Sequence, residues 1–322
     1  MSSATAIAHP NIALVKYWGK RDSDLNLPAT GSLSMTLDIF PTTTTVTLDT
    51  AAAADVLVFN GRERTDGPAL RVTRFLDIVR GLAGSDVFAR VETENTVPSA
   101  AGLASSASGF AALAVAASAA YGLDLDASAL SRLARRGSGS ASRSVIPGFA
   151  IWHAGDGDET SFAEPIDAPD LAMVVAMVEK REKAVSSRDA MQRTVLTSPF
   201  YPAWITSTAE SLEEAAYACR AGDVVRLGGI TEVNALRMHA LIQSCDPPIR
   251  YLSPVSVEIF DRVAALRATG VDAWATADAG PNVVVLTRPE SVDAVTEALA
   301  GLAELAVARP GPAAALVTRT DA

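Results

Sequence analysis

The sequence predicts an α/β fold of the mixed, α+β kind, and two observations carry this prediction. Apolar runs typical of strands alternate with helical patterns along the whole of the 322 residues. In the second half, once extra helices are set aside, the predicted order is β-α-β-β-α-β, the split arrangement of ferredoxin-like domains. Because the pattern changes near residue 180, we expect two domains, residues 1–180 and 181–322, with a boundary placed to within several residues.

The first half is predicted to begin with strands. Residues 7–17 are apolar, and residues 32–48 alternate apolar positions with β-branched threonine, so both segments are typical of strands. Residues 70–82 have apolar positions at helical spacing. Residues 87–93 then form a strand that leads into a glycine-rich segment.

A second helix and another strand follow the glycine-rich segment. The Asp126 side chain can cap the free N–H groups at a helix start. That helix is expected to end near Gly137, where Gly-Ser-Gly-Ser begins. Residues 144–153 are predicted to be a strand.

The second half begins with residues 171–178, an apolar run typical of a buried strand. Helices are expected at 203–221 and 223–244. Ser253 is a capping residue for a further helix whose first turn holds Pro254. The remaining elements are expected to be strands at 272–276 and 283–286, joined by a turn, a helix from 289 onward and a final strand at 314–318.

Composition and charge narrow the class of function. Hydrophobic residues make up 49% and charged residues 20% of the chain, which is enough apolar material for a folded core. The net charge of −10 argues against nucleic acid or an anionic membrane as the main partner, although a few local cations can still bind a small anion. Cys219 and Cys245 lack metal-ligand spacing, so we expect buried thiols of a reducing compartment.

Membrane association is not expected. The N-terminus lacks the cationic and apolar regions of a secretory signal. Residues 95–123 carry no charge, but they are mostly Ala, Ser and Gly, which insert poorly into a bilayer. We interpret them as a loop followed by a buried helix, and we expect a cytoplasmic protein.

Residues 98–109 offer the chemistry of a phosphate-binding loop. Gly102 permits close backbone approach, and Ser105, Ser106 and Ser108 supply hydroxyls. The helix that follows presents free N–H groups and the positive end of its dipole. The segment is neither a Walker A loop nor a Rossmann fingerprint, and small residues also suit close packing of a helix on a sheet. Clustered hydroxyls need partners when buried, which favours the anion site.

Three further segments carry candidate functional residues. Residues 16–21 contain three cations beside two aromatics, which suits phosphate or carboxylate recognition and equally suits a solvated strand end. Residues 137–144 supply backbone and hydroxyl donors next to Arg143, or form an ordinary helix end and linker. Residues 278–282 join two apolar strands, either as a simple hairpin turn or with Asp278 as a base or electrostatic stabiliser.

Together these segments resemble one family, the diphosphomevalonate decarboxylases of the GHMP kinase superfamily, to which galactokinase, homoserine kinase and mevalonate kinase also belong. The resemblance covers nearly the whole chain. It is carried by Lys-Tyr-Trp-Gly-Lys at 16–20, Ser-Leu-Ser-Met-Thr-Leu at 32–37, the serine-rich loop, Gly-Ser-Gly-Ser-Ala-Ser-Arg-Ser at 137–144, Val-Ser-Ser-Arg-Asp-Ala-Met at 185–191 and Asp-Ala-Gly-Pro-Asn at 278–282. The serine-rich loop alone indicates the superfamily, whereas the first and last motifs are specific to the family.

The resemblance implies a fold and an activity. The fold is GHMP-kinase-like, with a ribosomal-protein-S5-like N-terminal lobe, a C-terminal ferredoxin-like lobe with extra helices, and the ligands in the cleft between them. The family converts (R)-5-diphosphomevalonate and ATP, with Mg²⁺, to isopentenyl diphosphate, ADP, phosphate and carbon dioxide in isoprenoid biosynthesis. A homodimer is implied as well.

The resemblance also implies roles for individual residues near the reacting carbon. Asp278 is the base or orienting group for the C3 hydroxyl, and Arg143 holds the C1 carboxylate. Asn11 positions Arg143 or the substrate, and Lys16 lies near the transferring phosphate.

The resemblance implies further residues that bind the substrate's diphosphate and the phosphates of ATP. The substrate's diphosphate is bound by Tyr17, Lys20, Ser138, Gly139, Ser140 and Arg188, and its pocket is also lined by Ser187 and Met191. The ATP phosphates are bound at Pro98, Ala101, Gly102, Leu103, Ala104, Ser105, Ser106 and Ser108. No residue is assigned as a metal ligand.

Three other functions stay open at the level of sequence. A decarboxylase of 5-phosphomevalonate has a similar anionic substrate, and the donor-rich group of Tyr17, Lys20 and Arg188 favours the diphosphate. A mevalonate-3-kinase stops after phosphorylation, and Asp278 favours the full reaction. A nucleotide-binding protein that lost its activity would be expected to lack an ionisable residue at one of these positions.

Overall fold

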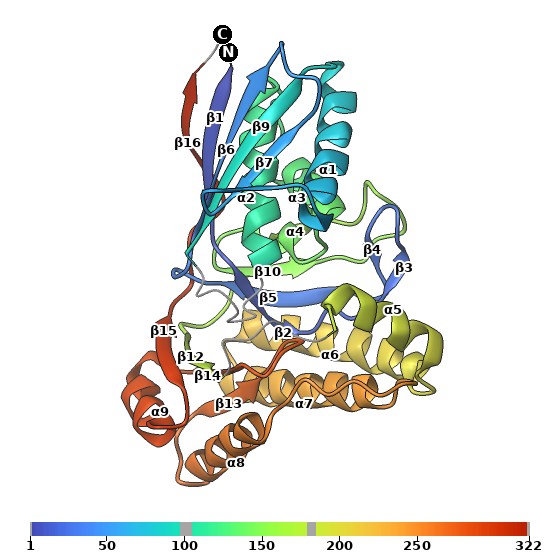
Figure 1. The fold of residues 1–322 in the computed structure, drawn as a ribbon. Coiled ribbons are helices and arrows are strands. Elements are labelled where there is room, and N and C mark those ends of the chain that lie inside the picture. The colour runs from blue at the N-terminus through green and yellow to red at the C-terminus, as the bar shows by residue number, and fades with distance from the viewer. Residues whose placement is uncertain (1, 97–104, 179–184, 321–322) are drawn as a thin grey trace.

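The structure, a computed structural model, describes residues 2–96, 105–178 and 185–320, and for Ser105 the backbone alone. The chain forms two lobes, one built mainly from its N-terminal half and the other from its C-terminal half (Figure 1). The first and last strands lie side by side in the N-terminal lobe (Figure 1). The predicted mixed α/β fold of two lobes is confirmed.

The outer part of the N-terminal lobe is a six-stranded sheet in the order β16-β1-β6-β9-β7-β8. Its strands are β1 (Ser3–Ala8), β6 (Thr42–Asp49), β7 (Val56–Phe59), β8 (Arg62–Arg64), β9 (Phe88–Asn95) and β16 (Ala315–Thr320). Along β6, Thr42, Thr44 and Val46 are buried and the positions between them are half-buried, as the threonine-rich alternation predicts.

Three helices accompany this sheet, namely α1 (Gly67–Ala83), α2 (Ser105–Ala120) and α3 (Ala127–Gly137). Helix α2 packs directly on β1 and β6 (Figure 1). Its alanines are almost all buried, so the uncharged segment is a buried helix as predicted. Asp126 caps α3 by accepting from the Ala129 N–H at 2.7 Å, which confirms the predicted helix start.

A second sheet, in the order β11-β10-β5-β2, faces the C-terminal lobe. Its strands are β2 (Asn11–Val15), β5 (Ser32–Thr36), β10 (Phe149–Trp152) and β11 (Ala163–Pro165). A separate hairpin joins β3 (Lys20–Asp22) to β4 (Leu27–Pro28). The predicted strand at 7–17 is two strands, because Pro10 between them has no N–H to donate. The strand predicted at 144–153 begins late, at Phe149, because α4 (Ala141–Ser144) and the turn that follows it, with Gly148 at φ 58°, occupy the preceding residues.

The C-terminal lobe has an antiparallel sheet in the order β13-β14-β12-β15. Its strands are β12 (Ala172–Met177), β13 (Ala273–Thr276), β14 (Val283–Thr287) and β15 (Glu304–Ala308). This is the predicted ferredoxin-like arrangement, with one correction. Its last strand is β15, whereas the strand predicted at 314–318 is β16, which leaves this lobe and pairs with β1.

Helices cover both faces of this sheet. On one face lie α8 (Pro254–Ala268), the short turn η1 (Pro289–Ser291) and α9 (Val292–Leu299). On the other lie α6 (Tyr201–Ala221) and α7 (Val224–Gln243), with α5 (Ser187–Thr197) beside them. Ser253 forms a capping box with Ser256, as its position before Pro254 predicts.

One buried apolar cluster joins the two lobes. It includes Leu33 of β5 and Phe149 of β10 from the N-terminal half, and Val175 of β12, Leu227 of α7 and Trp274 of β13 from the C-terminal half. Helices α6 and α7 are therefore packed between two sheets. The ends of β2 and β13 meet at this junction.

Two smaller expectations concern membranes and cysteines. Within the described ranges, no helix has the length and apolar character needed to cross a bilayer. Cys219 and Cys245 are free and buried, as predicted.

Candidate active site

A cavity of about 670 Å³ lies where the two lobes meet and gathers most of the predicted site residues. Its wall is formed by β2 and the loop after it, the turn between α3 and α4, the start of α5 and the turn after β13. Lys16 and Asp278, 262 positions apart in the sequence, touch here. The predicted residues on the wall are Asn11, Lys16, Tyr17, Lys20, Ser106, Ser138, Gly139, Ser140, Arg143, Ser187, Arg188, Met191 and Asp278.

Asp278 and Lys16 form an ion pair on this wall. Lys16 Nζ lies 2.6 Å from Asp278 Oδ1 and 2.8 Å from the Ala13 carbonyl oxygen, so two acceptors fix its position. Burial lowers the pKa of Lys16, Asp278 opposes that shift, and Arg143 adds to it. Lys16 is buried, whereas the Asp278 side chain keeps 35% of its surface exposed. The pair thus holds a carboxylate in one orientation while leaving part of it accessible from the cavity.

Asn234 and His239 on α7 support this pair, and neither was predicted from the sequence. The Lys16 N–H donates to Asn234 Oδ1 at 2.8 Å, and His239 Nε2 lies 3.3 Å from the Ala277 carbonyl oxygen. Burial, helped by the charge of Lys16, lowers the pKa of His239 to about 4, so the ring is neutral at pH 7. Only their burial among the apolar side chains of α7 distinguishes these residues, and the sequence does not show it.

Arg143 is buried and held by two polar side chains. Its Nε and Nη2 donate to Asn11 Oδ1 at 3.2 and 3.0 Å, and its Nη1 donates to Ser32 Oγ at 2.6 Å. Asn11 itself donates to the Ser140 carbonyl oxygen at 2.9 Å. Burial lowers the pKa of Arg143 to about 10, an effect that Asp278 opposes, so the guanidinium is charged at neutral pH. Asn11 therefore lies where it can orient Arg143.

Tyr17 lies against the turn that follows α3. A Cβ atom at Gly139 would come within 2.8 Å of the Tyr17 ring and hydroxyl, so a side chain there would displace the tyrosine. The ring meets Trp152 edge-on, with centroids 4.9 Å apart. Among the described residues the buried Tyr17 hydroxyl has no hydrogen-bond partner, and burial raises its pKa. A protonated hydroxyl on the cavity wall can donate to a ligand oxygen.

Lys20 belongs to a group of cations at one end of the cavity. Its Nζ donates to Asn26 Oδ1. Burial lowers the pKa of Lys20 to about 8, and the nearby charges of Arg188 and Arg71 contribute to the shift. Arg71 was not predicted, because a cation on the surface of a predicted helix gives no sign of what it faces. It lies on α1 and donates to the Gly137 carbonyl oxygen at 3.3 Å.

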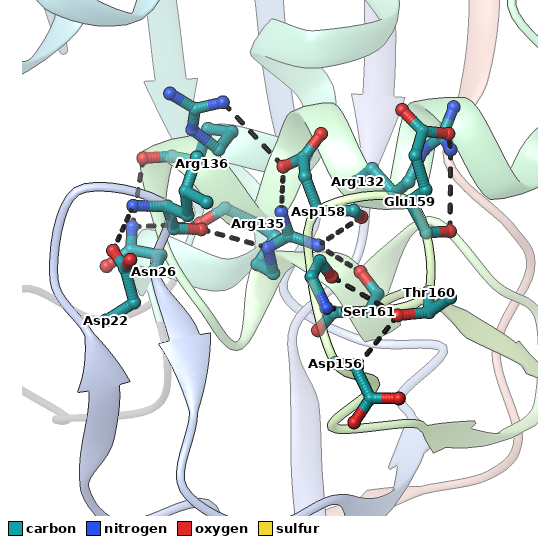
Figure 2. Close-up of polar contacts among 12 residues, drawn as sticks. Asp22, Asn26, Arg132, Arg135, Arg136, Asp156, Asp158, Glu159, Thr160 and Ser161 are labelled. Carbon is teal, nitrogen blue, oxygen red and sulfur yellow. Dashed lines mark hydrogen bonds and ion pairs between the residues drawn. The ribbon is translucent and has the colours of Figure 1, made fainter.

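Asn26 connects the hairpin of Lys20 to the end of α3, as Figure 2 shows. Its Nδ2 donates to the carbonyl oxygens of Arg135 and of the residue after it, both at 2.9 Å. The Arg135 side chain is wholly buried, donates to the Leu25 carbonyl oxygen at 3.1 Å and pairs with Asp158. The hairpin and the turn after α3 therefore share one support.

The start of α5 brings three more predicted residues to the wall. Ser186 caps the helix by accepting from the Asp189 N–H at 3.1 Å. The first two turns then carry Ser187, Arg188 and Met191 along the cavity.

The serine-rich loop is only partly described. Ser106 lines the cavity, with its Oγ 3.2 Å from Ser138 Oγ. Ser108 lies deeper, with its buried Oγ 2.7 Å from Thr42 Oγ1, so its predicted contact with a phosphate stays a prediction. The predicted ligands that lie outside the described residues are Pro98, Ala101, Gly102, Leu103 and Ala104.

The fold and the cavity define a class of protein, a GHMP-kinase-like chain whose two lobes meet at a cavity lined by several cations. The model of the diphosphomevalonate decarboxylase-like N-terminal domain matches residues 8–163, and that of the mevalonate 5-diphosphate decarboxylase C-terminal domain matches residues 173–308. The chain belongs to the diphosphomevalonate decarboxylase family.

Individual relatives agree with this assignment. Diphosphomevalonate decarboxylase of Candida albicans is 37% identical over 320 residues, which cover 93% of this chain and 88% of that protein. The structure of mevalonate diphosphate decarboxylase from Enterococcus faecalis is 46% identical, with a TM-score of 0.92 over 98% of this chain and 99% of that one. A structure described as MDDEF in complex with MVAPP, AMPPCP and magnesium is 47% identical, with a TM-score of 0.94 and the same coverage.

Proposed function

We propose that this chain catalyses the ATP-dependent decarboxylation of (R)-5-diphosphomevalonate to isopentenyl diphosphate, with ADP, phosphate and carbon dioxide as the other products. The observation that carries the proposal is the Asp278 carboxylate, held by Lys16 in the same cavity as Arg143. The similar structure that holds MVAPP, AMPPCP and magnesium supports the choice of substrates.

The first chemical step makes a leaving group. Hydroxide leaves a tertiary carbon poorly, so the C3 oxygen attacks the γ-phosphorus of ATP and ADP departs. Asp278 orients the C3 hydroxyl and accepts its proton. Lys16, 2.6 Å from Asp278, keeps that carboxylate in place and adds a positive charge near the transferring phosphoryl group.

The second step breaks two bonds and forms an alkene. The C3–O bond breaks, its electron pair leaves with phosphate, and positive charge develops at C3. The electron pair of the C1–C2 bond then forms the double bond between C2 and C3, and C1 leaves as carbon dioxide. We assign Arg143 to the C1 carboxylate, since Asn11 and Ser32 fix the direction of its guanidinium.

The substrate's diphosphate and the phosphates of ATP are assigned to different residues. We assign the substrate's diphosphate to Lys20, Arg188, Tyr17 and the turn at 138–140, with Ser187 and Met191 beside it. We assign the ATP phosphates to Ser106 and the N-terminal end of α2, because the start of a helix suits an anion. Within the described ranges no group of three or more His, Cys, Asp or Glu side chains could hold a metal. The hydroxyl oxygen of Ser106 is a ligand type that fits Mg²⁺, which would neutralise phosphate charge when bound.

Incubation with ATP, Mg²⁺ and 5-diphosphomevalonate tests the proposal, with carbon dioxide, ADP and isopentenyl diphosphate all measured. We expect the three products in equal amounts. ADP without carbon dioxide would indicate a mevalonate-3-kinase instead. A parallel reaction with 5-phosphomevalonate distinguishes the remaining rival, and faster turnover of the monophosphate would overturn our choice of substrate.

We further propose a cytoplasmic homodimer whose chain divides near residue 180. The family resemblance supports the dimer, and sedimentation of the purified chain tests it. The pairing of β12 (Ala172–Met177) with β14 and β15 supports a division several residues earlier, before residue 172, while β16 returns to the first lobe.

A further inference from the structure

A second cavity, of about 610 Å³, lies next to the first. It is enclosed by α1, the β3–β4 hairpin, the end of α3 and α5. The two cavities share six wall residues, Lys20, Asn26, Arg71, Arg74, Arg188 and Met191. A ligand in the second cavity therefore reaches the same cations as a ligand in the first.

Cations outnumber acidic residues on the wall of the second cavity. Its described wall carries Lys20, Arg71, Arg74, Arg136 and Arg188, with Asp24 as the acidic residue among them. Two of these guanidinium groups have an N–H group without a hydrogen bond in the part of the chain that the structure describes. The buried Nε atoms of Arg71 and Arg136 have no hydrogen-bond partner among the described residues. In a chain of net charge −10, such a concentration of cations is a local site for an anion.

Apolar side chains of α1 and α5 also line the second cavity. Phe75 and Ile78 of α1 are three residues apart and share a helix face. Met191 and Val195 of α5 are four residues apart and likewise share a face, which Leu196 extends. Leu196 is 73% exposed, so the apolar wall continues to the surface. A ligand with an anionic head and a hydrocarbon tail could contact the cations with its head and the apolar side chains with its tail.

The proposed function assigns no part of diphosphomevalonate to these apolar wall residues. With its diphosphate at Lys20 and Arg188, its short carbon chain points toward Asp278, along the first cavity. Phe75 and Val195 line the second cavity and are not among the described residues that line the first. The second cavity thus has room for a tail that the substrate lacks.

We propose that the second cavity binds aliphatic diphosphates with longer hydrocarbon tails, the head at Lys20, Arg71 and Arg188 and the tail between α1 and α5. Such a ligand competes with diphosphomevalonate, because both require the same cations. The competition rests on the proposed function, whereas the binding itself does not.

Calorimetric titration with hexyl and dodecyl diphosphate, below their micelle concentrations, measures the binding directly. We expect dodecyl diphosphate to bind at least about tenfold more tightly, since each buried methylene strengthens binding about fourfold and part of the tail stays exposed. Dodecyltrimethylammonium, with the same tail and a cationic head, should not bind. In kinetic assays dodecyl diphosphate should act as a competitive inhibitor, which raises the apparent KM for the diphosphomevalonate substrate and leaves kcat unchanged.

The double variant Val195→Ser/Leu196→Ser removes apolar surface from the tail wall alone. It should lose the preference for the dodecyl chain, with hexyl diphosphate affinity and kcat unaltered. Leu82→Ser, on an exposed residue of α1 outside the cavity wall, is the matched control and should keep the preference. Equal affinity for the two chains in the unmodified protein, or an undiminished preference in the double variant, would overturn the proposal. A protein that binds these ligands without any decarboxylation would overturn the proposed function alone.

Discussion

At the scale of single residues, the site depends on charges that are held rather than free. Lys16 and Arg143 are both buried, and each is fixed by at least two partners. Burying a charge is costly unless it is paired and hydrogen bonded, so such groups are rare where they serve no purpose. Because their positions are fixed, Lys16 and Arg143 do not need to move when a reacting group arrives. Electrostatic catalysis depends mainly on such preorganised charges.

Asp278→Asn tests the carboxylate directly. The amide keeps the shape of the side chain but neither accepts a proton nor carries the charge that Lys16 pairs with. We expect kcat to fall by about two to four orders of magnitude, the usual range for a positioned acid–base group, with a much smaller change in substrate affinity. Steady-state assays of carbon dioxide release measure both quantities. A variant with near-normal kcat would remove Asp278 from the chemistry.

Lys20 provides a prediction about pH. In the proposed function its ammonium form binds the diphosphate, and because the pKa of Lys20 is lowered to about 8, this form is lost as the pH rises through that value. A hydrogen bond to a charged group contributes about 1.5–3 kcal/mol, so KM should rise by about one to two orders of magnitude above pH 8. Below that pH KM should be flat. Initial rates at a series of substrate concentrations and pH values measure the profile.

Lys20→Arg is the control for this profile, because an arginine at that position stays charged well above pH 8. Its KM should lose the inflection near pH 8. If the inflection remains in Lys20→Arg, the titrating group is another residue and the assignment to Lys20 is wrong.

At the scale of elements, the features that the sequence predicted are those that depend on neighbouring residues in the chain. The capped starts of α3 and α8 were found because Asp126 and Ser253 act on N–H groups a few residues away. The β3–β4 hairpin was missed, since its turn depends on Asn26 in a left-handed conformation (φ 53°) bonded to α3, over a hundred residues later. The partner of β16 was missed for the same reason, because strand pairing with β1 is decided by the whole fold.

Some residues of the candidate site could likewise be predicted from the sequence, and others could not. The motifs that carry the family resemblance marked Asp278 and Arg143, and the structure brings both to one cavity. Asn234 and His239 belong to no recognisable motif. They contribute through contacts with Lys16 and Ala277, which form only when the chain has folded.

The support of the hairpin yields a prediction at this scale. Asp158→Asn removes the negative charge that pairs with the buried Arg135 guanidinium, while the backbone acceptors around Arg135 remain (Figure 2). We expect a loss of about 1–3 kcal/mol in the free energy of unfolding, the range for a buried polar group left under-satisfied. KM should rise more than kcat falls, because the displaced hairpin carries Lys20. Urea unfolding and steady-state kinetics measure the two effects.

Glu159→Gln, one residue further along, is a matched control. Glu159 is 79% exposed and pairs with Arg132 at the surface, where ion pairs contribute less than about 1 kcal/mol. Neither stability nor KM should change appreciably. Equal behaviour of Asp158→Asn and Glu159→Gln would show that the hairpin does not depend on the buried pair.

At the scale of the whole molecule, the cavity exists because the lobes share a core. Leu227 on α7 is fully buried in the cluster that joins β5 and β10 of one lobe to β12 and β14 of the other. The ends of β2 and β13, which carry Lys16 and Asp278, extend from the two sides of that cluster. Lobes with separate cores would move against one another more freely, and the contact between these side chains would have no fixed length.

A shared core predicts a single cooperative unfolding transition for the 322-residue chain, although proteins of this size often unfold in stages. Leu227→Ala should shift the whole heat-absorption peak to lower temperature, since a large-to-small change in a core costs about 2–5 kcal/mol. Differential scanning calorimetry measures the shift. Val225→Ala, on an exposed position of the same helix, should leave the peak almost unmoved. If Leu227→Ala instead splits the peak and leaves one part at the original temperature, that part unfolds independently of the shared cluster. The coupling of Lys16 to Asp278 would then require another structural cause.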